Sequence, residues 1–210
     1  FYEQCLQKIR DLEEAIDTSS SLPLAVRSVL NEPRLSGIHD AVSKLIEIDE
    51  KYTDAFSVAL GASSNYIVVE KEKDAKEAIA YLKQKHLGRA TFYPLDVIQK
   101  KELDPDLFYR LKKEEGFLGI ASDLASFAPI YANIVKNLLG LTVVVDTLDH
   151  ASLIAKKFHH RLRIVTLQGE LLQPGGSLTG GYLKPTHNPL KDKFDLAQEK
   201  TKLHLLESEK

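Results

Sequence analysis

The chain has 210 residues, 43% of them hydrophobic, and a formal net charge of −2 at pH 7. This composition predicts one or two folded domains and excludes an intrinsically disordered chain, and the near balance of charges gives no global electrostatic signal for nucleic-acid binding. No apolar run approaches the roughly 18 residues that a membrane-spanning helix needs. A single cysteine, Cys5, excludes an internal disulfide and a CxxC metal or redox site. The chain lacks methionine, and both ends look cut from a longer protein.

The first sixteen residues predict an amphipathic helix. Their apolar side chains recur at spacings of 3, 4, 3 and 4, the heptad pattern of a coiled coil, at Tyr2, Cys5, Ile9, Leu12 and Ile16. Two heptads are fewer than the three or four that define a coiled coil, so an ordinary surface helix remains open. Residues 190–210 contain no Gly or Pro and predict a second helix whose seam phase is unresolved. We expect these helices to be the two antiparallel strands of one arm, because each needs a partner for its apolar stripe.

The middle of the chain contains a weak internal repeat. Two β-branched runs, residues 66–70 and 141–146, each end at an acidic residue. Each run leads into a helical pattern, over residues 74–85 in one unit and 148–158 in the other. A second short strand follows, over residues 89–92 and 163–166 respectively. Five elements in the same order predict two related α/β subdomains. Residues 99–116 are charged and predict a linker with a short helix.

The glycine-rich stretch 174–181 is the most distinctive motif. It is not a phosphate-binding P-loop, because Gly181 and Tyr182 stand where that motif needs Lys and Ser or Thr. Thr179 likewise breaks the GxSxG pattern of a nucleophile elbow around Ser177. Two interpretations remain open: a flexible surface loop, or a place where the backbone closely approaches another backbone at a bulge, a sheet edge or an interface.

No catalytic set emerges from the titratable residues. None of the seven histidines has the spacing of a zinc site, and no acid, base and nucleophile assemble in one motif. A basic cluster does occur in residues 156–163, which hold four Lys or Arg and no acid. Arg161 and Arg163 alternate, so on a strand they would share a face. The cluster is interpreted either as a solvated surface or as a patch that contacts the phosphate backbone.

The order of several motifs resembles the hinge domain of bacterial SMC (structural maintenance of chromosomes) proteins. The resemblance covers about residues 25–183 and departs from the family's usual pattern at Leu178, where Met is common. The motifs that carry it are Val58-Ala59-Leu60-Gly61, Gly88 to Leu95, Gly116 to Leu124, Leu138-Leu139-Gly140, Arg163 to Glu170 and Gly175 to Gly181.

The resemblance implies an α/β (α+β) fold with mixed sheets in two related subdomains, flanked by antiparallel coiled-coil helices. The implied boundaries are an N-terminal coiled-coil stub (1–20), subdomain I (21–98), a linker (99–116), subdomain II (117–185) and a C-terminal stub (186–210). It also implies a homodimer in which subdomain I of each chain pairs with subdomain II of the other. The implied interface residues are Gly175, Gly176, Gly180 and Gly181.

The resemblance further implies weak, non-specific DNA binding through basic residues near the coil junction. The matching positions are Lys101, Arg161, Arg163 and Lys184. ATP hydrolysis would belong to head domains that this chain lacks, so we expect no enzyme activity, no metal and no cofactor here. Other condensin subunits would bind only through regions absent from this chain, no membrane is involved, and the location would be cytoplasmic and nucleoid-associated. The alternative hypothesis is an α/β nucleotide- or metabolite-binding enzyme that uses loop 175–181.

Overall fold

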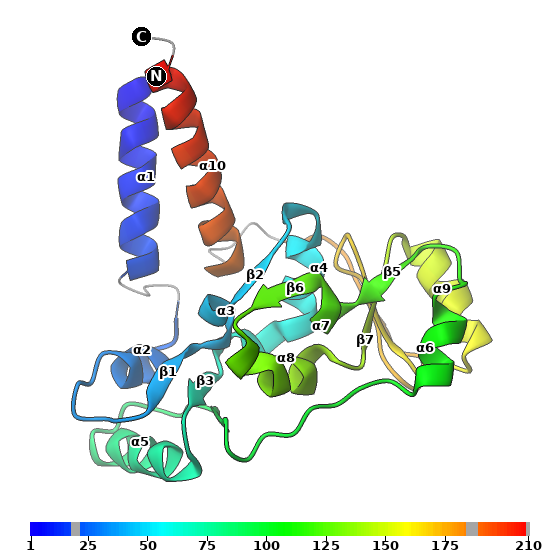
Figure 1. Ribbon diagram of the computed structural model, residues 1–210, viewed down its shortest axis with the longest axis horizontal. Helices are drawn as coiled ribbons and strands as arrows, with labels where there is room; N and C mark the ends of the chain where they lie inside the picture. Colours follow the sequence, from blue (N-terminus) through cyan, green and yellow to red (C-terminus); the bar gives the residue numbers. More distant parts are fainter. Residues whose placement is uncertain (18–21, 184–188, 209–210) are drawn as a thin grey trace.

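The computed structural model describes residues 1–17, 22–183 and 189–208. A pair of long helices projects from a body of mixed helices and strands (Figure 1). The pair, to which we refer as the arm, consists of α1 (Tyr2–Asp17) and α10 (Pro189–Ser208), which run antiparallel with the chain ends at the tip. Within the described ranges, no helix combines the length and apolarity needed to cross a membrane.

The arm confirms the predicted heptad seam of α1. Cys5 and Ile9 are buried where α1 packs against α10, and the other predicted seam residues are half-buried. The seam of α10 contains half-buried leucines and the buried acid Glu199, in the order Leu196, Glu199, Leu203 and Leu206. The phase of this helix could not be predicted because a glutamate occupies a position where the pattern requires an apolar residue.

The body confirms the internal repeat. Each half contains the same seven elements in the same order. In the first half these are β1 (Ile38–Ala41), α3 (Val42–Leu45), β2 (Ile46–Ile48), α4 (Thr53–Leu60), β3 (Ile67–Val69), α5 (Glu72–Gln84) and β4 (Phe92–Pro94). In the second half they are β5 (Phe117–Ile120), α7 (Ala121–Leu124), β6 (Ala125–Phe127), α8 (Ala132–Leu139), β7 (Thr142–Val145), α9 (Leu148–Lys157) and β8 (Arg163–Thr166).

The remaining elements extend or connect the two halves. They are α2 (Leu24–Leu30), α6 (Pro105–Leu111), β9 (Leu171–Leu172), β10 (Leu178–Thr179) and three short 3₁₀ turns, η1 (Glu50–Tyr52), η2 (Gly61–Asn65) and η3 (Pro129–Tyr131). The first half has no described counterpart of β9 and β10. One predicted strand is displaced: the sequence predicts residues 89–92, whereas β4 begins at Phe92. The strand starts late because its hydrogen bonding to β3 begins only where the Ile67 N–H donates to the Thr91 carbonyl.

Three mixed or antiparallel sheets organise the body. The first half forms a sheet of order β1-β3-β4, and the second half forms one of order β10-β9-β8-β7-β5. Both sheets combine one parallel pair with antiparallel neighbours, and both carry a bulge at the same point of the repeat, in β1 and in β5. A third, two-stranded sheet pairs β2 with β6, so one strand from each half ties the halves together. The predicted α+β fold with mixed sheets is therefore confirmed.

Three apolar clusters form the interior. One lies in the first half between α2, α5 and the sheet, and one lies in the second half between α6, α9 and the sheet. The third and central cluster takes residues from both halves, including Phe56 of α4, Ile134 of α8 and Val144 of β7. Leu190, at the base of the arm, is buried in this central cluster and so anchors α10 to the body.

Residues 99–104 cross the molecule as an extended segment that ends in α6 (Figure 1). The predicted short helix is present: Asp104 caps it by accepting hydrogen bonds from the N–H groups of Asp106 and Leu107, at 2.9 and 3.3 Å. Leu111 of α6 is fully buried in the core of the second half. The C-terminal part of the expected linker thus contributes to the second core, and the exact boundaries of the two subdomains stay a prediction.

Candidate functional site

The glycine loop forms the hairpin between β9 and β10. Leu178 and Thr179 of β10 pair with Leu172 and Leu171 of β9, and Gln173 N–H donates to the Ser177 carbonyl at 2.9 Å to close the turn. Within the part of the chain that the structure describes, the other side of β10 has no neighbouring strand. The hairpin is exposed, and the Leu178 side chain is 58% exposed although it is apolar.

The four predicted glycines all lie in this exposed hairpin region. Gly175, Gly176 and Gly181 have φ values of 94°, 103° and 128°, a backbone region that other residues enter only with strain. Gly180 is different: it has no such φ, and an added Cβ would lie 3.1 Å from the Glu170 side chain. Three of the glycines are therefore required by the shape of the chain itself, whatever they contact.

The hairpin does not support a phosphate-binding loop. Such a loop connects a strand to a helix whose N-terminal N–H groups face the phosphate. Here residues 173–177 connect β9 to β10, and after β10 the chain continues as irregular backbone through Leu183, the last described residue before 189. The alternative hypothesis of a nucleotide-binding enzyme using this loop gains no support from the structure.

A second free strand edge lies in the first half. The sheet order β1-β3-β4 leaves one side of β4 without a neighbour among the described residues. In the repeat, β4 corresponds to β8, and β8 pairs with β9 on that side. The first half thus has a vacant edge where the second half has a strand. The chain offers two complementary free edges, β10 in one half and β4 in the other.

The predicted DNA-contacting residues only partly come together. Arg161 is exposed and lies in the turn after α9, ahead of β8, so the expectation that it shares a strand face with Arg163 is wrong. Lys101 is exposed on the linker. Its backbone carbonyl packs so closely on Gly140 that a Cβ added at Gly140 would overlap this carbonyl. Lys184 lies outside the described residues.

Arg163 is engaged inside the protein. Its Nη1 donates to Thr142 Oγ1 at 2.8 Å, and its Nη2 donates to the Ala59 carbonyl at 3.0 Å. Burial lowers the pKa of its guanidinium. Because Ala59 belongs to α4 and Arg163 to β8, this side chain connects the two halves, a role that sequence reasoning missed.

Arg161 and Arg163 line one hollow of about 520 Å³, to which we refer as the arginine pocket. It lies between α6, the turn after α9 and the start of the β9–β10 hairpin. His159 and His160 of that turn both have positive φ values, 59° and 53°, and the His160 carbonyl accepts a 2.7 Å hydrogen bond from Gly175 N–H. The turn therefore fixes the position of the hairpin relative to the pocket.

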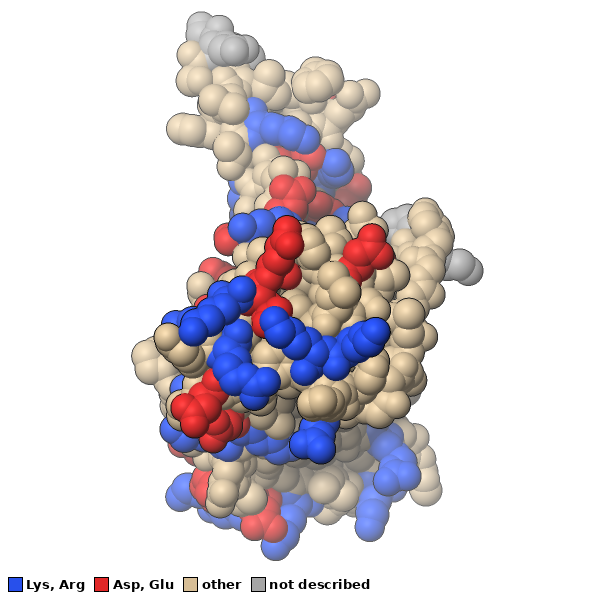
Figure 2. Space-filling model, turned by 90° about the vertical axis from the view of Figure 1, so that its right-hand side faces the viewer, with Lys and Arg blue, Asp and Glu red and all other residues tan. Residues whose placement is uncertain are grey.

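The elements around the pocket, α6 and α9, lie at the end of the body that is away from the arm (Figure 1). The expectation of a basic site near the coil junction is thus wrong for Arg161. Figure 2 looks onto this end and shows Lys and Arg side chains gathered there, with fewer Asp and Glu among them. Sequence reasoning missed the contribution of α6 and the turn after it, because the exposed cations Arg110, Lys112 and Lys113 come next to α9 only through folding.

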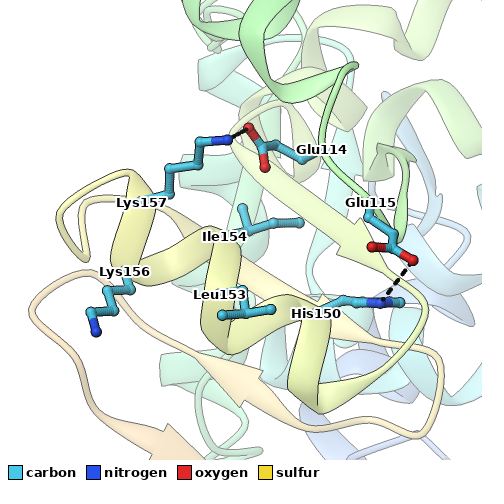
Figure 3. A pocket seen from close by; sticks show the side chains of 7 residues that line it. All are labelled: Glu114, Glu115, His150, Leu153, Ile154, Lys156 and Lys157. Carbon is cyan, nitrogen blue, oxygen red and sulfur yellow. Dashed lines mark ion pairs between the residues drawn. The ribbon is translucent and has the colours of Figure 1, made fainter.

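A second hollow, of about 400 Å³, opens on another face of α9 (Figure 3). Four of its five polar side chains form two pairs, Lys157 with Glu114 at 2.6 Å and His150 with Glu115 at 3.6 Å. The hydrogen bond to Asp146 raises the pKa of His150, and the same bond lowers the pKa of Asp146. The pairs of His150 stabilise the start of α9, and the Lys157–Glu114 pair lies at its last residue. Across the described residues, no cluster of His, Cys, Asp and Glu could hold a metal ion.

Comparisons with known proteins agree on one family. The family model described as "SMC proteins Flexible Hinge Domain" matches residues 35–155. The chain is 39% identical over 204 residues to the chromosome partition protein Smc of Bacillus subtilis, covering 95% of this chain and 17% of the relative. It is 42% identical over 154 residues to Smc of Desulfitobacterium hafniense, covering 73% of this chain and 13% of that protein.

Solved structures give the same result. An asymmetric dimer of the Geobacillus stearothermophilus SMC hinge domain matches with a TM-score of 0.89 and 35% identity, over 99% of this chain and 84% of that one. The Pyrococcus furiosus SMC hinge domain matches with a TM-score of 0.63 and 30% identity, over 87% and 96% of the two chains.

Proposed function

The chain belongs to the SMC hinge-domain family, and on that premise we propose that it is the homodimerisation hinge of a chromosome-organising SMC ATPase. In this role it joins two coiled-coil arms and carries out no reaction of its own. The chain spans less than a fifth of the Bacillus and Desulfitobacterium relatives, so ATP hydrolysis, further subunits and a place on the nucleoid belong to the proposal for the whole protein.

The observation that carries the proposal is the pair of free strand edges. If β10 of one chain adds to β4 of its partner, a two-fold axis repeats the same contact on the other side, and the ring closes with every β4 and β10 edge paired, while β1 and β5 form the outer edges of each joined sheet. Each contact would join the three strands of one chain to the five strands of the other in one continuous sheet. The glycines beside β10 let a second backbone approach closely, and Leu178 would lose its exposure to water.

Light scattering coupled to size-exclusion chromatography tests this directly. We expect a mass of about 47 kDa at micromolar concentration, twice the 23.5 kDa of the chain. A mass of one chain under these conditions would contradict the proposal.

We further propose weak, non-specific contact with DNA at the end of the body that carries the arginine pocket. Lys101 and Arg161 are exposed there and available to phosphates, which dominate such contacts. Arg163 takes the internal role described above, and Lys184 remains a candidate from the sequence alone. The gathering of cations around α6 and α9 supports this proposal, since it makes a local basic surface on a chain whose total charge is slightly negative (Figure 2).

A further inference from the structure

The arginine pocket combines apolar and cationic side chains in its lining. The apolar ones include Leu103, Leu107 and Leu141, and the cationic ones are Arg110, Arg161 and Arg163. Leu141 is 42% exposed. An exposed apolar hollow on a folded body indicates a binding site, because a surface of this kind gains free energy when a partner covers it.

The charges of the pocket are unbalanced. No Asp or Glu lines it, and none of its three arginines forms an ion pair with a carboxylate of the described residues. The Arg110 guanidinium lies 4.9 Å from the Phe158 ring centre, and Arg163 reaches only the neutral oxygens of Thr142 and Ala59. Arg110 and Arg161 are exposed cations without an anion, and they favour a ligand that brings carboxylates, which arginine binds in bidentate geometry.

The apolar side chains of the pocket indicate what the carboxylates are attached to. A nucleobase binds most strongly by stacking on a free aromatic face. The Phe158 ring is buried and is covered by Arg110, so the imidazole of His159 is the one exposed aromatic ring in the lining, and leucines supply most of the remaining apolar surface. A hollow of about 520 Å³ accommodates one or two large apolar side chains.

We propose that the arginine pocket binds an acidic peptide segment of a partner protein, which inserts a large apolar side chain between Leu103, Leu107 and Leu141. Carboxylates on either side of this anchor would pair with Arg110 and Arg161. The inference goes beyond the proposed hinge function. Because Arg161 also belongs to the proposed DNA surface, peptide and DNA would compete for this end of the molecule.

The test uses the full chain and fluorescence anisotropy. The probe is a fluorescein-labelled synthetic peptide in which a Leu-Phe pair is flanked on both sides by Asp and Glu residues. A second peptide replaces the Leu-Phe pair with Gly-Gly at the same charge. We expect the first peptide to bind at least about tenfold more tightly than the second, since the anchor contributes buried apolar area. Equal binding of the two peptides would overturn the proposal, because charge alone would then explain it.

Variants localise the binding. Leu141→Asp and Arg110→Glu should each weaken the anchored peptide at least about tenfold, whereas Lys83→Glu, an exposed charge reversal on α5 in the other half, should leave it unchanged. Unchanged binding by Leu141→Asp would overturn the proposal. The opposite pattern would also overturn it: if Leu141→Asp weakens the binding of a thymidine oligonucleotide and not that of the peptide, the pocket binds nucleic acid.

Two further measurements on the same samples complete the design. Thermal unfolding followed by circular dichroism checks that each variant is folded, which we expect because Leu141 and Arg110 are partly or largely exposed. Light scattering reports the dimer independently, so loss of peptide binding with an intact dimer separates the pocket from the hinge function.

Discussion

Lys8 of α1 and Glu199 of α10 form an ion pair across the arm, with Nζ and Oε1 2.8 Å apart. The Glu199 side chain is buried in the seam, where it also pairs with Lys202 at 3.1 Å and accepts a hydrogen bond from the Cys5 thiol at 3.4 Å. A buried charge of this kind is satisfied only while its partners stand opposite it. Glu199 therefore specifies the register of the two helices, in the manner of polar seam residues in coiled coils.

The arm should lose stability in acid through Glu199. The hydrogen bond from Lys8, followed by the one from Lys202, lowers the pKa of Glu199 to about 2, below the value of about 4.3 for an unfolded glutamate. A depressed carboxyl pKa stabilises the folded state above the unfolded pKa, and this stabilisation is lost as the pH falls from about 4.3 towards 2. The melting temperature of Glu199→Gln should accordingly change less over this range than that of the parent chain. Glu3→Gln, at an exposed position of the same helix pair, is the matched control, and identical pH profiles for the two variants would refute the assignment.

Arg163 should matter for stability more than for DNA binding. Replacing Arg163 with Ala removes its bonds to Thr142 and to the Ala59 carbonyl, and we expect a loss of about 2 kcal/mol in the free energy of unfolding. Urea denaturation measures this loss. Arg161→Ala, which removes an exposed arginine two residues away, should cost less than about 0.5 kcal/mol. Equal costs for the two variants would show that the Arg163 bonds contribute nothing.

Charge reversal at the exposed cations should weaken DNA binding. In Lys101→Glu and Arg161→Glu, the affinity for duplex DNA should fall, and the slope of log affinity against log salt should decrease by roughly one for each lost phosphate contact. Fluorescence titrations at several salt concentrations give both quantities. Lys83→Glu makes the same charge change on α5. If this control loses as much DNA affinity, the loss is due to net charge and not to the two positions.

The free edge of β10 should be required for the dimer. Leu178→Asp places a charge on a side chain that is 58% exposed, so the fold of one chain should tolerate it while the pairing of two chains should not. Light scattering should then report a folded single chain. Leu153→Asp, at a leucine of α9 that is 66% exposed, is the matched control and should remain dimeric. This variant is more informative than bulky replacements of Gly175 or Gly181, whose positive φ values would strain the fold itself.

The sequence predicted the parts of the fold that depend on local pattern. The repeat was visible because each β-branched run, its acidic end and the helix after it recur in the same order, and β8 has the predicted bounds. The seam of α1 followed from apolar spacing alone. The prominence of the hairpin 175–181 followed from its glycines, three of which the backbone conformation requires.

Long-range contacts account for what the sequence did not predict. In the sequence Glu199 resembles a surface residue, because its partner Lys8 lies 191 positions earlier and comes opposite it only in the folded chain. Arg163 resembles a surface cation until α4 presents the Ala59 carbonyl. The arginine pocket depends on α6, part of the expected linker, packing beside α9. The periodicity of the sequence does not predict contacts between residues that are so far apart in the chain.

Interchain cross-linking tests the proposed edge-to-edge contact most directly. Cys5→Ser removes the chain's one cysteine, and single cysteines are then placed at exposed positions beside the two edges, in Thr179→Cys and Thr91→Cys. With a short bismaleimide, a mixture of the two single variants should give a cross-linked product of two chains, whereas neither variant alone should. Cross-linking of Thr179→Cys to itself, or none in the mixture, would contradict the pairing of β10 with β4 of the partner.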